Sequence, residues 1–275
     1  MAGAEAGKVG APRGFRQSTG RTIAEIAILL VAFGALLLGL RGCAGWLAGA
    51  IVSQVPASVD ATIGKAGGEA MRVQYGGREA PSPEDQARAA RVFDELRENL
   101  TPEEAKTLGN PRLTVVRDPL VNAFALPGGE VFVLTGLLDR TKDDDGALRG
   151  VLAHELGHAV RRHGVRGLVR NSVYGLALAF LLGDIEGLTG TLVAGASQLD
   201  TLSHSREMEE EADEFGVDLL RRAGHDGEGL ARFMESMETQ PVPELLSTHP
   251  DPLERARAIR ERIREREKKN PAPAR

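Results

Sequence analysis

The chain has very little cysteine, since Cys43 is the only one among 275 residues. A single thiol cannot close an internal disulfide, so the sequence excludes a small secreted scaffold held together by disulfide bonds. The chain also lacks a basic patch interleaved with aromatic residues, and its formal net charge is −5 at pH 7. These absences argue against nucleic-acid binding. The length leaves room for one domain with a full core and an N-terminal appendage, and the sequence contains no internal repeat.

Charge is scarce near the N-terminus. Residues 22–59 carry only Glu25 and Arg41, and residues 26–40 are uninterruptedly apolar. The stretch 23–42 reaches the roughly twenty residues that a membrane-spanning helix needs, provided that Glu25 and Arg41 sit at the two interfaces. We therefore expect one N-terminal transmembrane helix, an anchor within residues 22–50.

The charges before this stretch predict its orientation. They are mostly positive: Lys8, Arg13, Arg16 and Arg21 against Glu5. The positive-inside rule places residues 1–21, which we expect to be disordered, in the cytoplasm and the following domain on the other side of a bacterial cell membrane, in the periplasm. Two alternatives concern cleavage. Residues 40–43 resemble a lipoprotein signal box that would lipidate Cys43, and an ordinary cleaved signal peptide is the other alternative.

The most informative motif is His154-Glu155-Leu156-Gly157-His158. Positions i and i+4 of a helix lie on one face, so both imidazoles can reach a single metal ion while Glu155 points at the water bound to it. Apolar residues at helical spacing on both sides predict that this helix is buried. The alternative is a helix whose two histidines only cap or pack.

A tetrahedral metal site needs a third protein ligand, and the acidic run 205–213 offers Glu209. Glu209 lies on the same side of the expected helix as the apolar stripe of Ala212 and Gly216. Asp213 is one helical turn further, where it can accept a hydrogen bond from the free N–H of a ligand imidazole. We interpret the remaining carboxylates of this run as a solvated face: Glu207, Glu210, Glu211 and Glu214.

These motifs carry a resemblance to a known family. A His-Glu-x-x-His helix is followed by Glu-x-x-Ala-Asp at residues 209–213 and by Thr248-His249-Pro250, and is preceded by a strand-like segment at 122–138. In this order, over residues 113–255, they resemble the HtpX-type and CAAX prenyl endopeptidase-type gluzincin metallopeptidases. With one expected span, the chain is nearer to single-span or soluble bacterial members that degrade misfolded envelope proteins than to the multi-span members.

The resemblance implies a fold, a cofactor and roles for residues. The fold would be α+β, mainly α: a zincin-like metallopeptidase domain with a small β-sheet before the active-site helix. One Zn²⁺ per chain would be held by His154, His158 and Glu209, with Glu155 as the catalytic base and Asp213 orienting a ligand histidine. The substrates would be polypeptides, and the sequence assigns neither substrate-binding residues nor an oligomeric state.

The other histidines separate into one candidate and three bystanders. His249 lies on an expected loop, where it could donate a hydrogen bond to the oxyanion of the transition state or act as a removable fourth ligand. A third interpretation places it in the N-cap region of a helix that begins near Pro252. Arg255 is a weaker candidate for contact with substrate or with a metal ligand. The three histidines that we expect to be exposed are His163, His204 and His225.

The remaining pattern predicts one domain over residues 56–270. A helix at 84–100 would have Ser82 as its N-cap and a buried face formed by Ala87, Ala90, Phe93, Leu96 and Leu100. Short strands are expected at 113–116, 123–126 and 131–134, and strand 123–126 or 130–134 could hold a substrate backbone if it lies at the sheet edge. An apolar hairpin is expected at 173–202 and a helix rich in i, i+4 ion pairs at 253–269, with residues 271–275 disordered.

Two functions fit these patterns. The first is a membrane-anchored zinc endopeptidase of envelope quality control that cleaves peptide bonds by Glu155-assisted attack of zinc-bound water. The second is a membrane-tethered chaperone or assembly factor with a latent zinc site. The complete set of ligands and base favours the enzyme.

Overall fold

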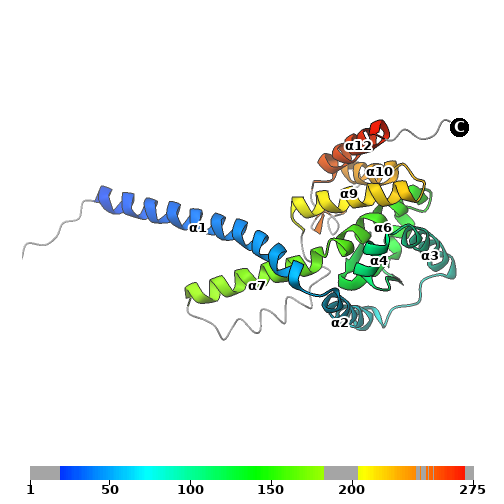
Figure 1. Ribbon diagram of the computed structural model, residues 1–275, viewed down its shortest axis with the longest axis horizontal. Helices are drawn as coiled ribbons and strands as arrows, with labels where there is room; N and C mark the ends of the chain where they lie inside the picture. Colours follow the sequence, from blue (N-terminus) through cyan, green and yellow to red (C-terminus); the bar gives the residue numbers. More distant parts are fainter. Residues whose placement is uncertain are drawn as a thin grey trace, which may run out of the picture. The chain divides into compact units, whose positions relative to one another are not determined.

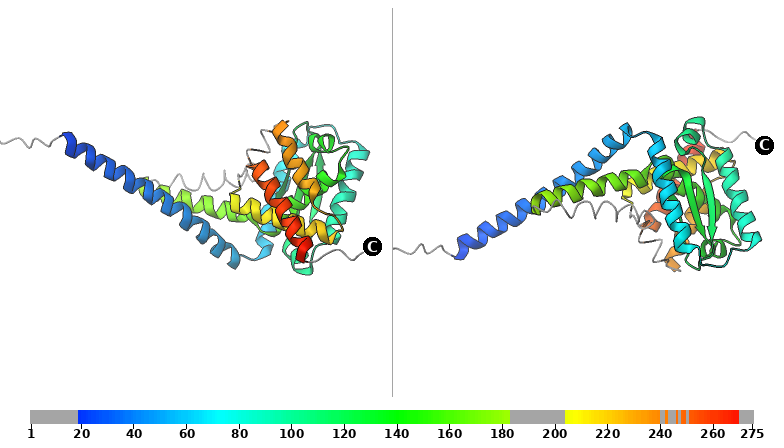
Figure 2. Two further views of the ribbon diagram at one scale, coloured as in Figure 1. Left: turned by 90° about the horizontal axis from the view of Figure 1, so that it is seen from above. Right: turned by 90° about the horizontal axis from the view of Figure 1, so that it is seen from below.

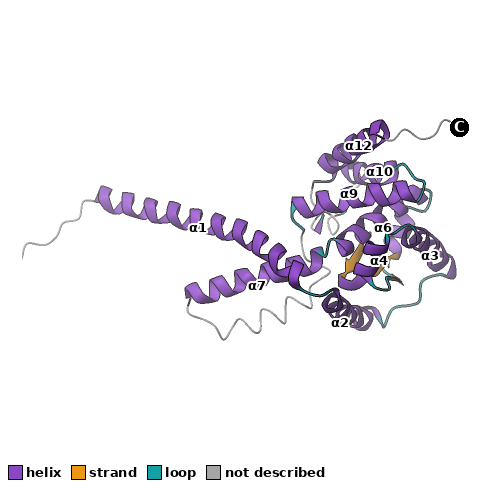
Figure 3. Ribbon diagram, in the orientation of Figure 1, coloured by secondary structure: helices purple, strands orange, loops and turns teal. Residues whose placement is uncertain are grey.

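The computed structural model describes residues 19–182, 204–239 and 251–269, and also Val242, Leu246, Thr248 and His249. The chain divides into two units, Met1–Cys43 and Ala44–Arg275. The described part of the second unit is mainly helical with a small mixed sheet, as the sequence predicts (Figure 3). The helices after the sheet include α6 (Asp145–Val160), α9 (Arg206–Arg222), α10 (Glu228–Thr239) and α12 (Pro252–Lys269) (Figure 1).

Helix α1 (Thr19–Gln54) contains the whole apolar run 26–40. Ile26, Ile28 and Val31 are exposed. Among the described residues, no helix combines the length and the hydropathy of a membrane span. The segment 22–50 is therefore helical as expected, and its insertion in a membrane stays a prediction.

The sheet consists of β1 (Arg112–Val116), β2 (Ala123–Leu126) and β3 (Glu130–Leu134), which match the expected strands. Their order is β1-β3-β2, with β3 parallel to β1 and antiparallel to β2. The turn Pro127–Gly129 joins β2 to β3, and its two glycines have φ of 75° and 83°, which residues with a Cβ rarely adopt. Helix α2 (Ala57–Tyr75) contacts this turn and both strands (Figure 2).

The strand order decides between the two strands considered for substrate binding. Strand β3 has a partner on each side, so its hydrogen-bonding groups are already used and the suggestion of 130–134 as a substrate-binding edge is wrong. Strand β2 is an edge of the sheet within the described part of the chain. Helix α6, which contacts β2, packs next to that edge.

Helix α6 is the centre of the second unit. Asp144 caps its N-terminus by accepting a hydrogen bond from Ala147 N at 3.0 Å. Almost every residue from Ala147 to Ala159 is buried, because α3 (Pro83–Glu98), α9, α10 and β2 all contact the helix. A helix enclosed on all sides carries apolar residues all round, which explains why its sequence lacks a polar face.

Helix α3 corrects one prediction. Ser82 caps it as expected, but Ala87 and Ala90 are exposed, whereas Ala89 and Val92 are buried with Phe93. The true stripe follows i, i+3 and i+4 from Ala89, and alanines at neighbouring positions cannot indicate which side faces the core. Beyond α3, a capping box at Thr101 starts α4 (Pro102–Leu108). Two further helices complete the described elements: α5 (Thr135–Arg140), with 6 residues, and α7 (His163–Leu182), with 20 residues.

Helix α12 packs on α9 and α10, as Figure 2 shows. Its apolar positions Ala256, Ile259 and Ile263 are buried in one cluster with α10. The ion pairs found for this helix run to its neighbours instead of along its own surface, for example Arg260 to Glu228 at 2.9 Å and Arg266 to Asp218 at 2.8 Å. Of the expected hairpin 173–202, helix α7 covers residues up to Leu182, and the rest lies outside the described residues.

The contact between α6 and α10 makes Gly150 a testable position. A Cβ at Gly150 would lie 2.7 Å from Leu230 Cα, so Gly150→Ala should lower the free energy of unfolding by about 1–3 kcal/mol despite alanine's better helix propensity. Gly49 in helix α1 is the control, since a Cβ there would meet no heavy atom within 4 Å. Urea denaturation of both variants checks the expectation, and equal stabilities would contradict this packing.

Candidate active site

Helix α6 places His154, Glu155 and His158 in the interior, each buried. The Nε2 atoms of the two histidines are 2.9 Å apart, as expected for positions one helical turn apart whose rings converge. On the same helix, Glu155 turns toward strand β2, and the Ala125 N–H donates a hydrogen bond to its Oε2 at 3.1 Å. The base candidate therefore lies between the two imidazoles and the sheet edge.

Helix α9 brings Glu209 to the same point. Its carboxylate is 1% exposed, with Oε2 3.5 Å from His154 Nε2 and Oε1 3.4 Å from His158 Nε2. The close approach of the two helices depends on Gly157, because a Cβ there would lie 2.9 Å from Ala212 O. Packing against α9, and not the chemistry of the site, therefore explains the glycine at the fourth position of the five-residue motif.

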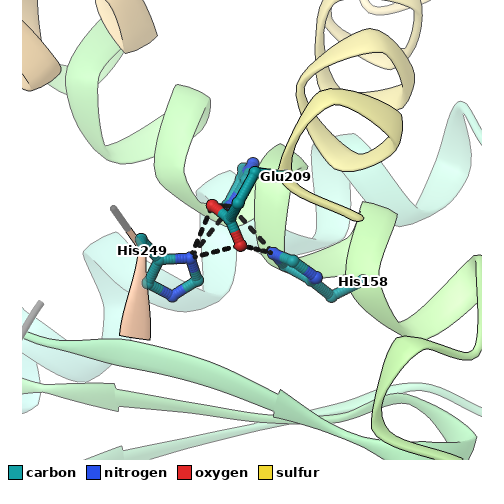
Figure 4. Close-up of side chains that lie close together, drawn as sticks. His158, Glu209 and His249 are labelled. Atoms are coloured by element: carbon teal, nitrogen blue, oxygen red, sulfur yellow. Dashed lines mark hydrogen bonds and ion pairs between the residues drawn. The ribbon is translucent and has the colours of Figure 1, made fainter. Parts of the chain in front are cut away.

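His249 joins His154, His158 and Glu209 in a cluster of four buried side chains (Figure 4). Its Nδ1 lies 3.0 and 3.2 Å from the two carboxylate oxygens of Glu209 and 3.4 Å from His154 Nε2. Its Nε2 lies 3.6 Å from Glu155 Oε1. The ring therefore points into the cluster. This placement favours a role as oxyanion donor or as removable fourth ligand over a helix-capping role.

The four residues His154, His158, Glu209 and His249 each offer one ligand atom, and these atoms lie within 4.8 Å of one another. In a tetrahedral zinc site with bonds of about 2.1 Å, the ligand atoms are about 3.4 Å apart. The separations of 2.9 to 3.5 Å between these nitrogen and oxygen atoms agree with that geometry. The donor set is also one that zinc accepts, so the residues fit a zinc ion.

At Glu209 and His158 the electrostatics of the cluster suit metal binding. Burial alone would raise the pKa of Glu209, but the surrounding histidines hold it well below its ordinary value. Burial lowers the pKa of His158 well below its usual range. Burial and Arg255 would lower the pKa of His154 too, but hydrogen bonds to two carboxylates raise it to about 9. Glu209 and His158 therefore present unprotonated ligand atoms, which coordination requires.

Glu155 is in a different electrostatic environment. Burial raises its pKa above the usual value, and the positive charges of His249 and His154 only partly oppose this. A carboxylate whose pKa is moved toward neutrality is better matched to accepting a proton from water and returning it.

Asp213 and Arg255 contact two of the candidate ligands, His154 and Glu209. His154 Nδ1 lies 2.9 Å from Asp213 Oδ1, and Arg255 donates to both oxygens of Asp213 at 2.7 and 2.8 Å. The same guanidinium reaches Glu209 Oε2 at 2.5 Å. Arg255, a weaker candidate in the sequence, thus contacts one expected ligand and the carboxylate that orients another.

Two histidines expected to be exposed lie against the cluster instead. His163 is 0% exposed, with its Nδ1 2.8 Å from His158 Nδ1, and His204 is partly buried and stacks on His158 with ring centroids 4.0 Å apart. Only His225 agrees in part, since it is half-buried and pairs with Glu95 at 2.5 Å. Polar sequence neighbours suggested exposure, but the fold decides the environment. Glu211 was also expected to be solvated, and it pairs with His163 and Arg166.

Comparison with known proteins agrees with this geometry. The model of peptidase family M48 matches residues 83–263. The mitochondrial metalloendopeptidase OMA1 of Arabidopsis thaliana is 36% identical over 152 residues, 53% of this chain and 30% of that protein. The beta-barrel assembly-enhancing protease of Escherichia coli K12 is 34% identical over 166 residues, 54% of this chain and 33% of that protein. The metalloprotease YcaL of the same strain is 33% identical over 153 residues, 52% of this chain and 58% of that protein. The chain thus spans about a third of the length of the first two relatives.

Arg255 generates a prediction about stability. Arg255→Ala leaves Glu209 and Asp213 buried without their cation, which should cost about 3–5 kcal/mol of unfolding free energy in the metal-free chain. Arg206→Ala is the control, because Arg206 is exposed and pairs with Asp251 at 2.8 Å. This substitution should lower the unfolding free energy by less than about 1 kcal/mol. Urea unfolding in the presence of a chelator measures both, and equal losses would show that the buried arginine does not balance this site.

Proposed function

The chain belongs to peptidase family M48, and on this premise we propose that it is a zinc endopeptidase with Glu155 as general base. The proposed ligands are His154, His158 and Glu209. The expected resemblance to metallopeptidases is supported, because the chain matches peptidase family M48. The relatives named above are OMA1, the beta-barrel assembly-enhancing protease and YcaL, and not HtpX-type or CAAX prenyl endopeptidase-type enzymes. The observation that carries the proposal is Glu155: it is buried beside the cluster although metal binding alone does not require it.

The chain's own residues account for the steps of the reaction. When bound, zinc acts as a Lewis acid that polarises the scissile carbonyl and lowers the pKa of water. Glu155 accepts the proton of the attacking water and passes it to the leaving amine, so the enzyme forms no covalent intermediate. Asp213 and Arg255 hold His154 and Glu209 in place while this happens.

Strand β2 is the proposed binding site for the substrate backbone. It is the described sheet edge that lies beside Glu155, and residues 122–125 line a pocket together with Glu155, His204 and His249. An extended peptide can add to such an edge by main-chain hydrogen bonds. Glu155 also lines a second, apolar pocket together with Phe233 and Met237 of α10, and we propose that this pocket takes a substrate side chain.

The cellular setting is also a proposal. We infer a single-pass anchor within residues 22–50, with residues 1–21 in the cytoplasm and the domain at 56–270 in the bacterial periplasm. The apolar run 26–40 within α1 and the exposed Ile26, Ile28 and Val31 support an apolar environment for this helix. We propose misfolded envelope proteins as substrates and a role in envelope quality control, and the name of one relative, a beta-barrel assembly-enhancing protease, supports an envelope role.

One observation favours the second candidate function, a membrane-tethered chaperone or assembly factor with a latent zinc site. His249 Nδ1 lies where a fourth ligand would complete a tetrahedron with His154 and Glu209. Sites with four protein ligands are usually structural, because no position is left for water. The same contact fits an enzyme that is held inactive until His249 leaves.

The general-base role is tested with the full-length chain, Glu155→Gln and, as control, Glu210→Gln, an exposed neighbour of Glu209 on α9. We expect all three to retain one zinc ion, and Glu155→Gln to cleave casein at least about 100-fold more slowly. Metal analysis and a casein assay with and without chelator give both values. Full activity of Glu155→Gln would exclude it as the base, and a zinc-loaded parent that does not cleave would favour the chaperone.

The role of His249 is tested by His249→Ala, with His225→Ala as a control histidine that also pairs with a carboxylate. If His249 is a removable ligand, as its distances favour, turnover of casein should rise. A residue that stabilises the oxyanion would instead give a fall of about 100-fold or more. Turnover unchanged from that of the parent would reject both roles.

A further inference from the structure

A second series of hydrogen bonds starts at His158, one of the four clustered residues, and is separate from the Asp213–Arg255 pair. It begins at His158 Nδ1, which is 2.8 Å from His163 Nδ1. His163 Nε2 is 2.9 Å from Glu211 Oε2, and Arg166 donates to the same oxygen at 2.6 Å. His163 is completely buried, so both of its ring nitrogens depend on these contacts.

The direction of each hydrogen bond follows from the last two members of this series, Glu211 and Arg166. Arg166 can only donate, and the ionised Glu211 carboxylate that it faces can only accept, so His163 donates from Nε2. The Nδ1 of a neutral His163 then carries a lone pair and accepts, which makes His158 Nδ1 the donor. A neutral His158 with its proton on Nδ1 has its lone pair on Nε2. That Nε2 atom lies 3.4 Å from Glu209 Oε1, among the proposed metal ligands.

We propose that His163 and Glu211 are positioning residues that fix the tautomer and ring orientation of His158 for metal binding. The inference rests on the zinc site of the proposed function and adds residues that the motif does not contain. Both histidine ligands then have a carboxylate anchored by an arginine behind them. For His154 the carboxylate is in direct contact, whereas for His158 an imidazole lies in between.

The turn after α6 is what brings His163 back to His158. Arg162 has φ of 58°, a left-handed conformation that residues with a Cβ rarely adopt, and it separates α6 from α7. Its guanidinium pairs with the buried Asp60 and donates to the carbonyl oxygens of Val52 and Val55, both at 2.8 Å. These contacts hold an otherwise unfavourable turn, and the reversal places His163 against the ring of His158.

A purely structural role for His163 makes a different prediction from a positioning role. As a buried, hydrogen-bonded residue it would affect folding alone, and zinc binding by the folded chain would be unchanged. As a positioning residue it should alter zinc affinity and ligand geometry at equal folded fraction, because such partners of metal-binding histidines typically contribute 10–100-fold in affinity.

The experiment uses the full-length protein and three variants of the residues in this hydrogen-bond series: His163→Ala, His163→Asn and Glu211→Ala. The controls are His225→Ala, at the His225–Glu95 pair, and Glu210→Ala, at an exposed neighbour of Glu211. Chelator competition measures zinc affinity, the visible spectrum of the Co²⁺ form reports ligand geometry, and urea unfolding of the metal-free chain measures folding.

We expect His163→Ala to bind zinc about 10–100-fold more weakly and to change the Co²⁺ spectrum. His163→Asn keeps an oxygen that can accept from His158 Nδ1–H, so it should recover most of the affinity and the parent spectrum. Glu211→Ala should weaken zinc binding and alter the spectrum in the same direction, and because Glu211 is partly exposed it should fold even if His163→Ala does not. Both controls should match the parent.

Parent affinity and spectrum in folded His163→Ala or Glu211→Ala would overturn the proposal, as would His163→Asn behaving no better than His163→Ala. A parent chain that binds no zinc at all is a distinguishable result. It would overturn the proposed function itself, together with this inference.

Discussion

The site depends on how closely helices α6 and α9 approach each other. The histidines come from one helix and Glu209 from the other, and their ligand atoms meet at about the edge length of a zinc tetrahedron. Such a distance requires a small residue at the crossing, and Gly157 against Ala212 supplies it. Because α6 is enclosed by α3, α9, α10 and β2, a shift of one helix cannot be absorbed without disturbing the whole core.

The second constraint is charge. Glu155, Glu209 and Asp213 are all buried, and a buried carboxylate needs a partner to offset its lost hydration. Arg255 supplies one positive charge to two of them. A divalent cation would supply the rest, so the domain's electrostatics and its proposed catalysis depend on the same ion. The hydrogen bonds that orient His154 and His158 are then as much a part of the folded core as of the active site.

The sequence predicted the parts of the site that follow from local spacing. Two histidines four residues apart on a helix had to share a face, and Asp213 one turn beyond Glu209 could reach an imidazole. The three strands were recognisable from β-branched and apolar residues with a Pro-Gly-Gly turn. Tertiary relationships were not recognisable. Nothing local indicates that β2 is the edge and β3 the centre, or that an unusual backbone at Arg162 turns His163 inward. The burial of α3 was misassigned for the same reason, because alanines on both sides of the helix satisfy helical periodicity.

We propose that the buried cluster holds one zinc ion through histidine and carboxylate ligands. X-ray absorption spectroscopy at the zinc edge of the full-length, zinc-loaded chain would identify the ligand atoms. We expect a four-coordinate shell of nitrogen and oxygen at about 2.0–2.1 Å with outer-shell scattering from imidazole rings. A shell containing sulfur, or a six-coordinate oxygen shell without imidazole scattering, would contradict it.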